Sequence, residues 1–174
     1  MQINGRAADA SELARLEGTY GVKVAPGSYW HDRRSGLAGR MGSYPQAYAP
    51  GFDFGAVPRN ASNGNTAILY NGRELNMAEA LMIANLLGVP ASQIPAYAGS
   101  YILESNGDVF TESGSFIINL VQVAMQRGQA SSGGGGGDNF WSTGGAYGNS
   151  SGGCSYITIP SSSGAGSTSV SSGC

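Results

Sequence analysis

Charged side chains are scarce in this chain and make up 11% of its 174 residues. An average globular protein has about 25%. The formal net charge is -2, and Lys23 is the single lysine, so the sequence offers no basic surface that could hold a phosphate backbone. We therefore expect no nucleic-acid partner. The weak net charge also favours self-association, because little repulsion keeps copies apart.

Long apolar runs are also missing. The longest apolar stretch, FIINLVQVAM at 116–125, is interrupted by Asn119 and Gln122. It is shorter than the roughly 18 residues that a membrane-spanning helix needs, so no span is predicted. The first residues contain neither a basic start nor an apolar segment, so we expect no secretory signal. The compartment stays open between the cytoplasm and, for a trimmed or unconventionally exported chain, the outside.

Cysteine and histidine, which supply many metal-binding and nucleophilic sites, are nearly absent. Cys154 and Cys174 could form a disulfide closing a loop of about twenty residues, or remain free thiols. His31, the single histidine, precedes Asp32 on a predicted strand, where neighbouring side chains face opposite sides. Such a pair cannot be oriented as in a catalytic triad. We predict no catalytic residue, metal site or cofactor, and interpret His31 as a surface residue beside a hairpin turn.

Two stretches of the chain resemble each other. Asn4-Gly5-Arg6 aligns with Asn71-Gly72-Arg73, and each motif is followed by an Asx-x-x-Glu capping box and a glycine at equal spacing. The strands that follow also align, Gly27 to Tyr29 with Gly99 to Tyr101. We interpret this as an internal duplication. The motifs are expected to structure turns, with each arginine bonding turn carbonyls or an acidic hairpin side chain rather than a ligand.

Each repeated unit is predicted to contain a strand, an Asn-Gly-Arg turn, a helix and a hairpin. The second helix is expected to begin after Asn76, which pairs with Glu79 in a capping box, and to end at Gly88. The hairpins are expected at 28–41 and 100–111. The predicted fold class is α+β: the two units form a small mixed or antiparallel sheet with helices packed on it.

Two segments are less regular. Residues 42–65, rich in proline, glycine and tyrosine, indicate extended segments and turns, with an edge strand around Phe52 to Phe54. Residues 116–127 fit both a helical stripe and a strand, and we favour a helix. The predicted domain covers residues 1–128.

The remaining segment, 129–174, is more than half glycine and serine. Such a composition buries too little apolar surface to offset its ordering entropy, so we expect it to be flexible, or ordered only by docking on a partner. Phe140, Trp141, Tyr147 and residues 156–159 could dock on a sheet edge or on a neighbouring copy, and Phe140, Trp141 and Tyr156 are the interface candidates among them.

Aromatic residues cluster between positions 29 and 70. An aromatic surface with little charge suits a protein interface or a sugar, whereas core packing is the alternative for the same side chains. The interface or ligand candidates in this cluster are Tyr29, Trp30, Tyr44, Tyr48, Phe52 and Phe54.

Two motifs resemble a known module, and the likeness covers about residues 27–114. PGSYWHDRRSG at 26–36 and ASNGNTAILYNGRE at 61–74 are similar to the module that precedes the Gα domain in the extra-large G proteins of plants, also found in bacterial proteins. The sequence departs from that pattern at Ala38, where tryptophan is usual, and at Gly55-Ala56, where Gly-Gly is usual. The resemblance implies no catalytic residue, and the GTPase domain is not part of this chain.

These observations favour a non-enzymatic structural or protein-interaction module. It is expected to form homo-oligomers or assemblies through its aromatic, low-charge surface and its glycine- and serine-rich segment. The alternative is a small ligand-binding or regulatory module, with carbohydrate as one ligand class. An enzyme is the third interpretation.

Overall fold

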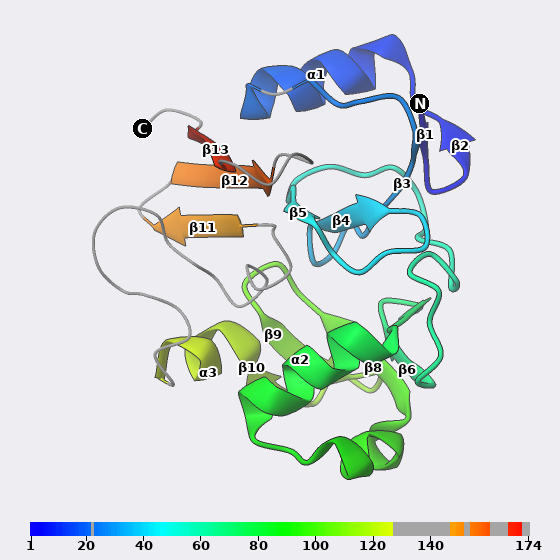
Figure 1. Ribbon diagram of the computed structural model, residues 1–174, viewed down its shortest axis with the longest axis vertical. Helices are drawn as coiled ribbons and strands as arrows, with labels where there is room; N and C mark the ends of the chain where they lie inside the picture. The colour runs from blue at the N-terminus through cyan, green and yellow to red at the C-terminus, as the bar shows by residue number, and fades with distance from the viewer. Residues whose placement is uncertain (22, 127–146, 152–153, 161–166, 172–174) are drawn as a thin grey trace.

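The computed structural model describes residues 1–21, 23–126, 147–151, 154–160 and 167–171 (Figure 1). Helices combine with two mixed five-stranded sheets and one three-stranded sheet. The predicted α+β class is confirmed. The prediction of one shared sheet is wrong, because each repeated stretch builds a sheet of its own.

We call residues 1–48 the first unit. The Asn-Gly turn reverses the chain after its first strand, and a helix and two hairpin strands follow. The elements are β1 (Gln2–Ile3), β2 (Arg6–Ala7), α1 (Ala10–Tyr20), β3 (Ser28–His31), β4 (Leu37–Arg40) and β5 (Ala47–Tyr48).

We call residues 68–126 the second unit, and it repeats this series with two additional helices. Its elements are β6 (Ile68–Tyr70), β7 (Arg73–Glu74), α2 (Met77–Leu87), the 3-10 helix η1 (Ala91–Tyr97), β8 (Gly99–Leu103), β9 (Asp108–Thr111), β10 (Phe116–Asn119) and α3 (Leu120–Gln126). Both predicted hairpins, β3–β4 and β8–β9, are confirmed.

The two sheets have the same strand order. The first is β2-β1-β3-β4-β5, and the second reads β7-β6-β8-β9-β10 in the same direction. In each sheet one pair is parallel, β1 with β3 and β6 with β8, and the other pairs are antiparallel. Each unit therefore places the ends of two parallel strands side by side, next to its Asn-Gly turn.

Both main helices begin and end as the sequence predicts. Asp9 and Asn76 each accept a hydrogen bond from the backbone three residues later, and Gly21 and Gly88 end the helices in left-handed conformation. The return bond of the capping box is present only in α1, where Glu12 accepts from the Asp9 amide. At α2 the predicted return bond, from the Asn76 amide to the Glu79 side chain, is wrong. The Glu79 carboxylate pairs with Arg73 instead.

Two further expectations need correction. Residues 52–54 form no strand, since Phe52 and Phe54 turn inward to pack with α1, and the edge strands of the first sheet are β2 and β5. Residues 116–126 are divided between strand and helix: β10 pairs with β9, and α3 begins at Leu120. The mixed pattern of this stretch thus reflects two elements in succession.

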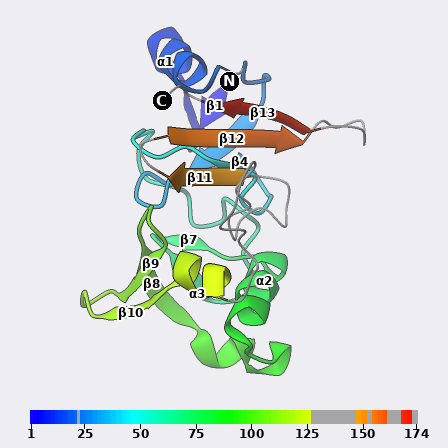
Figure 2. The ribbon, with the colours of Figure 1, turned by 90° about the vertical axis from the view of Figure 1, so that its left-hand side faces the viewer.

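Helices α2 and α3 cover one face of the second sheet (Figure 2). This face contributes Ile68, Tyr70, Leu103 and Val109 to the larger core. Trp30 and Leu37 of the first sheet join the same core, so the first sheet packs on the second unit. Among the described residues no single helix has the length and hydropathy to cross a membrane. Helices α2 and η1 meet the length and hydropathy requirements only when taken together, and the chain bends by 104° between them.

Three segments of the predicted tail form an antiparallel sheet, in the order β11-β12-β13. They are β11 (Tyr147–Ser151), β12 (Cys154–Pro160) and β13 (Ser167–Ser171), and β11 and β12 lie beside β5 (Figure 1). The boundary at residue 128 and the docking of this segment on a partner stay predictions. Phe140, Trp141 and Cys174 lie outside the described residues, so the disulfide with Cys154 stays a prediction too.

Candidate interaction site on the second unit

The Asn-Gly-Arg turns connect each unit internally. Asn4 and Asn71 both have a φ of 52°, which a type I′ hairpin turn requires. The Asn4 side chain donates to the His31 carbonyl and accepts from the His31 amide, both at 2.8 Å. The Asn71 side chain makes the same two bonds with Leu103, at 2.7 and 3.1 Å. Each asparagine thus ties its turn to the end of the neighbouring parallel strand.

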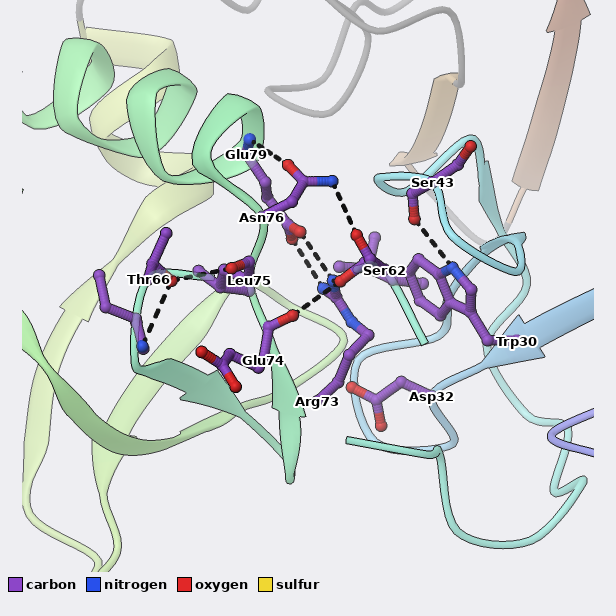
Figure 3. A network of polar contacts seen from close by, with 12 residues as sticks. Trp30, Asp32, Ser43, Ser62, Thr66, Arg73, Glu74, Leu75, Asn76 and Glu79 are labelled. Carbon is purple, nitrogen blue, oxygen red and sulfur yellow. Dashed lines mark hydrogen bonds and ion pairs between the residues drawn. The ribbon is translucent and has the colours of Figure 1, made fainter. Parts of the chain in front are cut away.

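Arg73 lies at the centre of a buried network that joins the two units (Figure 3). Its guanidinium donates to both carboxylate oxygens of Glu79, at 2.7 Å each, and to Ser62 Oγ at 2.9 Å. The Trp30 ring stacks on it, with 4.3 Å from Cζ to the ring centroid. Because the side chains of Arg73 and Glu79 are each 1% exposed, this pair is a structural element and not a ligand site.

Arg6 occupies the same position in the first unit but remains at the surface. It donates to both oxygens of Glu12 and, through Nε, to the Phe54 carbonyl at 3.2 Å. The predicted acidic hairpin partner is therefore wrong for both arginines, since each pairs with the glutamate of the following helix. Sequence spacing could have indicated this, because Glu12 and Glu79 each lie six residues after their arginine.

His31 is buried, which corrects the prediction of a surface residue. Its Nε2 lies 2.8 Å from the Ala49 carbonyl oxygen, and its ring packs edge-on against Phe54. Nδ1 is buried without a hydrogen-bond partner among the described residues. Burial lowers the pKa of the imidazole. The side chain packs against residues 49–54, which follow the first unit, and none of the contacts described for it is with a nucleophilic side chain.

The second sheet has one face that no described helix covers (Figure 2). Strand alternation and register place Ile102, Phe110 and Phe116 together on this face, which we call the open face. The Phe110 and Phe116 rings contact each other edge-on at 5.7 Å. Phe116 is 59% exposed, and Ile117 beside it is 45% exposed. An apolar row therefore crosses three strands and ends at the sheet edge.

A shallow depression of about 410 Å³ adjoins the open face. Ser100 and Ile102 line it from β8, and residues 32–34 and 55–57 line it from the other side. Its charged residues are Asp32, Arg33, Arg34 and Glu112, and all but Glu112 have partners within the chain. The Asp32 carboxylate accepts from Ser35, Asn71 and the Arg34 amide, and Arg34 pairs with Glu104. Because most of these charges are paired internally, the depression suits the rim of a protein contact better than an anionic ligand.

The predicted aromatic cluster divides between core and surface. Trp30, Phe52 and Phe54 are buried. For these three residues the structure confirms the alternative, packing in the core. Trp30 also lacks the exposed face that a sugar would need. Tyr29, Tyr44 and Tyr48 are half-buried. Tyr29 donates to the Ala25 carbonyl and Tyr48 to the Ser105 carbonyl, so both hydroxyls have internal partners.

The sequence reasoning missed the open face. Phe110 was part of a predicted strand, and Phe116 and Ile117 were assigned to a helical stripe. A signal was present, because Ile102 and Phe110 alternate with the buried Leu103 and Val109 in a predicted hairpin. The side chain of Tyr156 is not among those described. In the described parts of the chain no group of three or more metal-binding side chains occurs.

Comparison with known proteins gives two related sequences. Extra-large guanine nucleotide-binding protein 1 of Arabidopsis thaliana is 36% identical over 99 residues, which cover 55% of this chain and 11% of that protein. Extra-large guanine nucleotide-binding protein 2 is 38% identical over 63 residues, 35% of this chain and 7% of that protein. No protein-family model and no solved structure matches the chain. The chain spans about a tenth of the relatives that it matches, and its predicted resemblance to a part of the extra-large G proteins is confirmed.

Proposed function

We propose that this chain is a non-enzymatic protein-interaction module that self-associates through the open face of its second sheet. The observation that carries this proposal is the row of Ile102, Phe110 and Phe116, with Phe116 59% exposed at a sheet edge. Exposed aromatic clusters of this kind are typical of protein contacts. The low charge of the chain supports association between identical copies, because they repel each other weakly.

The chemistry of the described residues supports a binding role over catalysis. His31 is buried against a backbone carbonyl. Asp32 accepts three hydrogen bonds from its own chain, and Glu79 is occupied by Arg73. A general acid or base needs to reach a reacting group in a cleft, and these groups are committed to the fold. The similarity to extra-large guanine nucleotide-binding proteins covers too small a share of them to transfer an activity.

We further propose that the two units arose by internal duplication. Three features support this: the equal strand order, the equal asparagine bonds to His31 and Leu103, and the equal arginine pairs with Glu12 and Glu79. The relation matters for function because only the second unit exposes its outer sheet face. In the first unit the corresponding face carries Trp30 and packs on the second unit.

Light scattering coupled to size-exclusion chromatography tests the proposed self-association. We expect the mass of the wild-type chain to rise with concentration. Phe116→Ser should reduce this rise, because it removes the most exposed apolar side chain of the open face. Tyr97→Ser is the matched control, since Tyr97 is an exposed aromatic residue on η1, outside the open face.

The outcomes are separable. A monomeric mass at every concentration would contradict self-association. An equal loss of mass in Phe116→Ser and Tyr97→Ser would place the contact elsewhere. The glycine- and serine-rich segment is proposed to strengthen the contact, so a chain ending at residue 128 should associate more weakly than the whole chain.

A further inference from the structure

The second sheet ends in a strand with one unpaired side. β10 pairs with β9 through Phe116, Ile118 and Asn119. Among the described residues no other strand pairs with β10, and it is the last strand in the sheet order. Alternate backbone N–H and C=O groups of such a strand point away from the sheet and can pair with another chain.

Two other sheet edges in the molecule are covered. The outer side of β7 meets the segment that links the units, where the Glu74 amide donates to the Arg59 carbonyl at 2.8 Å. In the first sheet, β5 holds the position that β10 holds in the second sheet. β5 lies beside β11 and β12 of the same chain. In the first sheet, the edge equivalent to β10 therefore has strands of the same chain beside it, whereas β10 has none among the described residues.

β10 lacks the chemical protection of an edge strand. Natural edges are guarded by charged residues, above all lysine, by proline, by bulges or by being short. Residues 113–119, SGSFIIN, contain no charged residue and no proline, so the protection of β10 is limited to its short length and its bulge. A shift of register around Ile117 is the single interruption of the ladder, and it leaves that side chain 45% exposed. An apolar, uncharged edge of this kind favours strand addition.

We infer that β10 pairs antiparallel with β10 of a second copy of this chain, around a two-fold axis close to Ile117. This inference rests on the proposed self-association and specifies its contact. An identical edge supplies matching donors and acceptors, and no like charges meet across the axis, because residues 113–119 are uncharged. The open faces of the two copies then continue across the joint, with the two Phe116 side chains on one surface.

A second copy fits this edge better than a peptide from another protein. Peptides added to a sheet edge gain specificity from side-chain pockets beside that edge. The described depression is lined from β8, residues 32–34 and residues 55–57, and no residue of β10 belongs to its lining. The edge itself therefore offers backbone pairing and exposed apolar side chains, both of which an identical strand can match.

Charge at the proposed axis provides the first test. In Ile117→Lys two like charges meet at the joint, and we expect the dimer dissociation constant to rise by at least about tenfold. Tyr97→Lys is the control, because Tyr97 has the same exposed fraction of 45% and lies on η1. It should leave the dissociation constant unchanged. Light scattering at several concentrations measures both, and circular dichroism confirms that both variants fold.

Mixing opposite charges provides the second and sharper test. Ile117→Lys and Ile117→Glu should each be monomeric at a concentration where the wild type is dimeric. An equimolar mixture should recover the dimeric mass, because in a two-fold contact each residue 117 lies near its counterpart. Hydrogen exchange at low and high concentration should also show protection of the amides of residues 116–118 in the wild type alone.

The results distinguish this inference from the proposed function. If the wild type stays monomeric at all concentrations, self-association itself is wrong. If it associates but Ile117→Lys behaves like Tyr97→Lys, association is retained and the β10 contact is overturned. Failure of the Lys and Glu variants to associate with each other overturns the two-fold arrangement.

Discussion

The two units of this protein carry the same arginine–glutamate pair in two different environments. Arg6 and Glu12 have side chains 43% and 24% exposed, whereas Arg73 and Glu79 are 1% exposed each. The difference arises outside the repeated motif. Trp30 of the first unit and Ser62 of the linking segment cover Arg73, whereas Arg6 contacts Phe54 of the linking segment and keeps one side open to solvent. The same local motif thus stabilises a turn in one unit and joins two units in the other.

Removal of one charge from the buried pair should have the largest effect on stability. Glu79→Gln leaves the Arg73 guanidinium buried without a counter-charge, which costs about 3–5 kcal/mol of the free energy of unfolding. Glu12→Gln should cost far less, since water solvates Arg6. Urea denaturation of the two variants measures both values. Equal losses would contradict the view that burial, and not the motif, sets the strength of the pair.

The Trp30 side chain should rank next. Trp30→Ala removes a fully buried indole and leaves a cavity above Arg73, at a cost of about 3–5 kcal/mol. Its counterpart in the strand alignment is Ile102, which is half-buried on the open face. Ile102→Ala should cost well under half as much, because a partly exposed side chain leaves no closed cavity. Thermal unfolding of both variants tests this ranking.

Local features of the fold were accessible from the sequence. Asp9, Asn76, Gly21 and Gly88 set the helix ends correctly, because caps depend on residues only a few positions apart. Both hairpins followed from turn residues and alternation. The short return strands β2 and β7 escaped prediction, since two-residue strands carry no periodicity.

Features that depend on contacts between the units were not accessible. The sequence could not show that Trp30 faces Arg73, because this contact joins residues far apart in the chain. The spacing of Arg73 and Glu79 could indicate their pairing, but not that the pair is buried beneath Trp30. For the same reason Trp30 and Phe116 could not be ranked by exposure. The packing of the units buries Trp30 and leaves Phe116 exposed, so the candidate site lies on the second sheet and not in the first aromatic cluster.

His31 predicts a pH effect confined to the first unit. Burial lowers the pKa of its imidazole below the ordinary 6.5, although the carboxylates of Asp32 and Asp53 oppose the shift. Below pH 6.5 the imidazole is therefore protonated more fully in the unfolded chain than in the folded chain. The free energy of unfolding should fall as the pH drops from 6.5 toward the folded-state pKa. The corresponding residue of the second unit, Leu103, has no charge to gain.

Chemical denaturation between pH 7 and 5 measures this effect. In His31→Gln the dependence should flatten, because glutamine can still donate to the Ala49 carbonyl but does not titrate in this range. Carboxylates with lowered pKa, such as Asp53 and Glu74, lose their contribution only in more acidic solution and do not contribute here. An unchanged slope in His31→Gln would assign the pH dependence to another group.

The smallest effects are expected at the glycines that end the two helices. Gly21 and Gly88 have φ values of 64° and 69°, a left-handed conformation that costs an alanine about 1 kcal/mol. Gly21→Ala and Gly88→Ala should therefore destabilise the protein to the same extent, and additively when combined, because the strain is local. Urea denaturation of the two single variants and the double variant tests this. A larger loss at Gly88 would show that the junction between the units reaches the far end of α2, and that the asymmetry seen at the arginine pairs extends along the whole second unit.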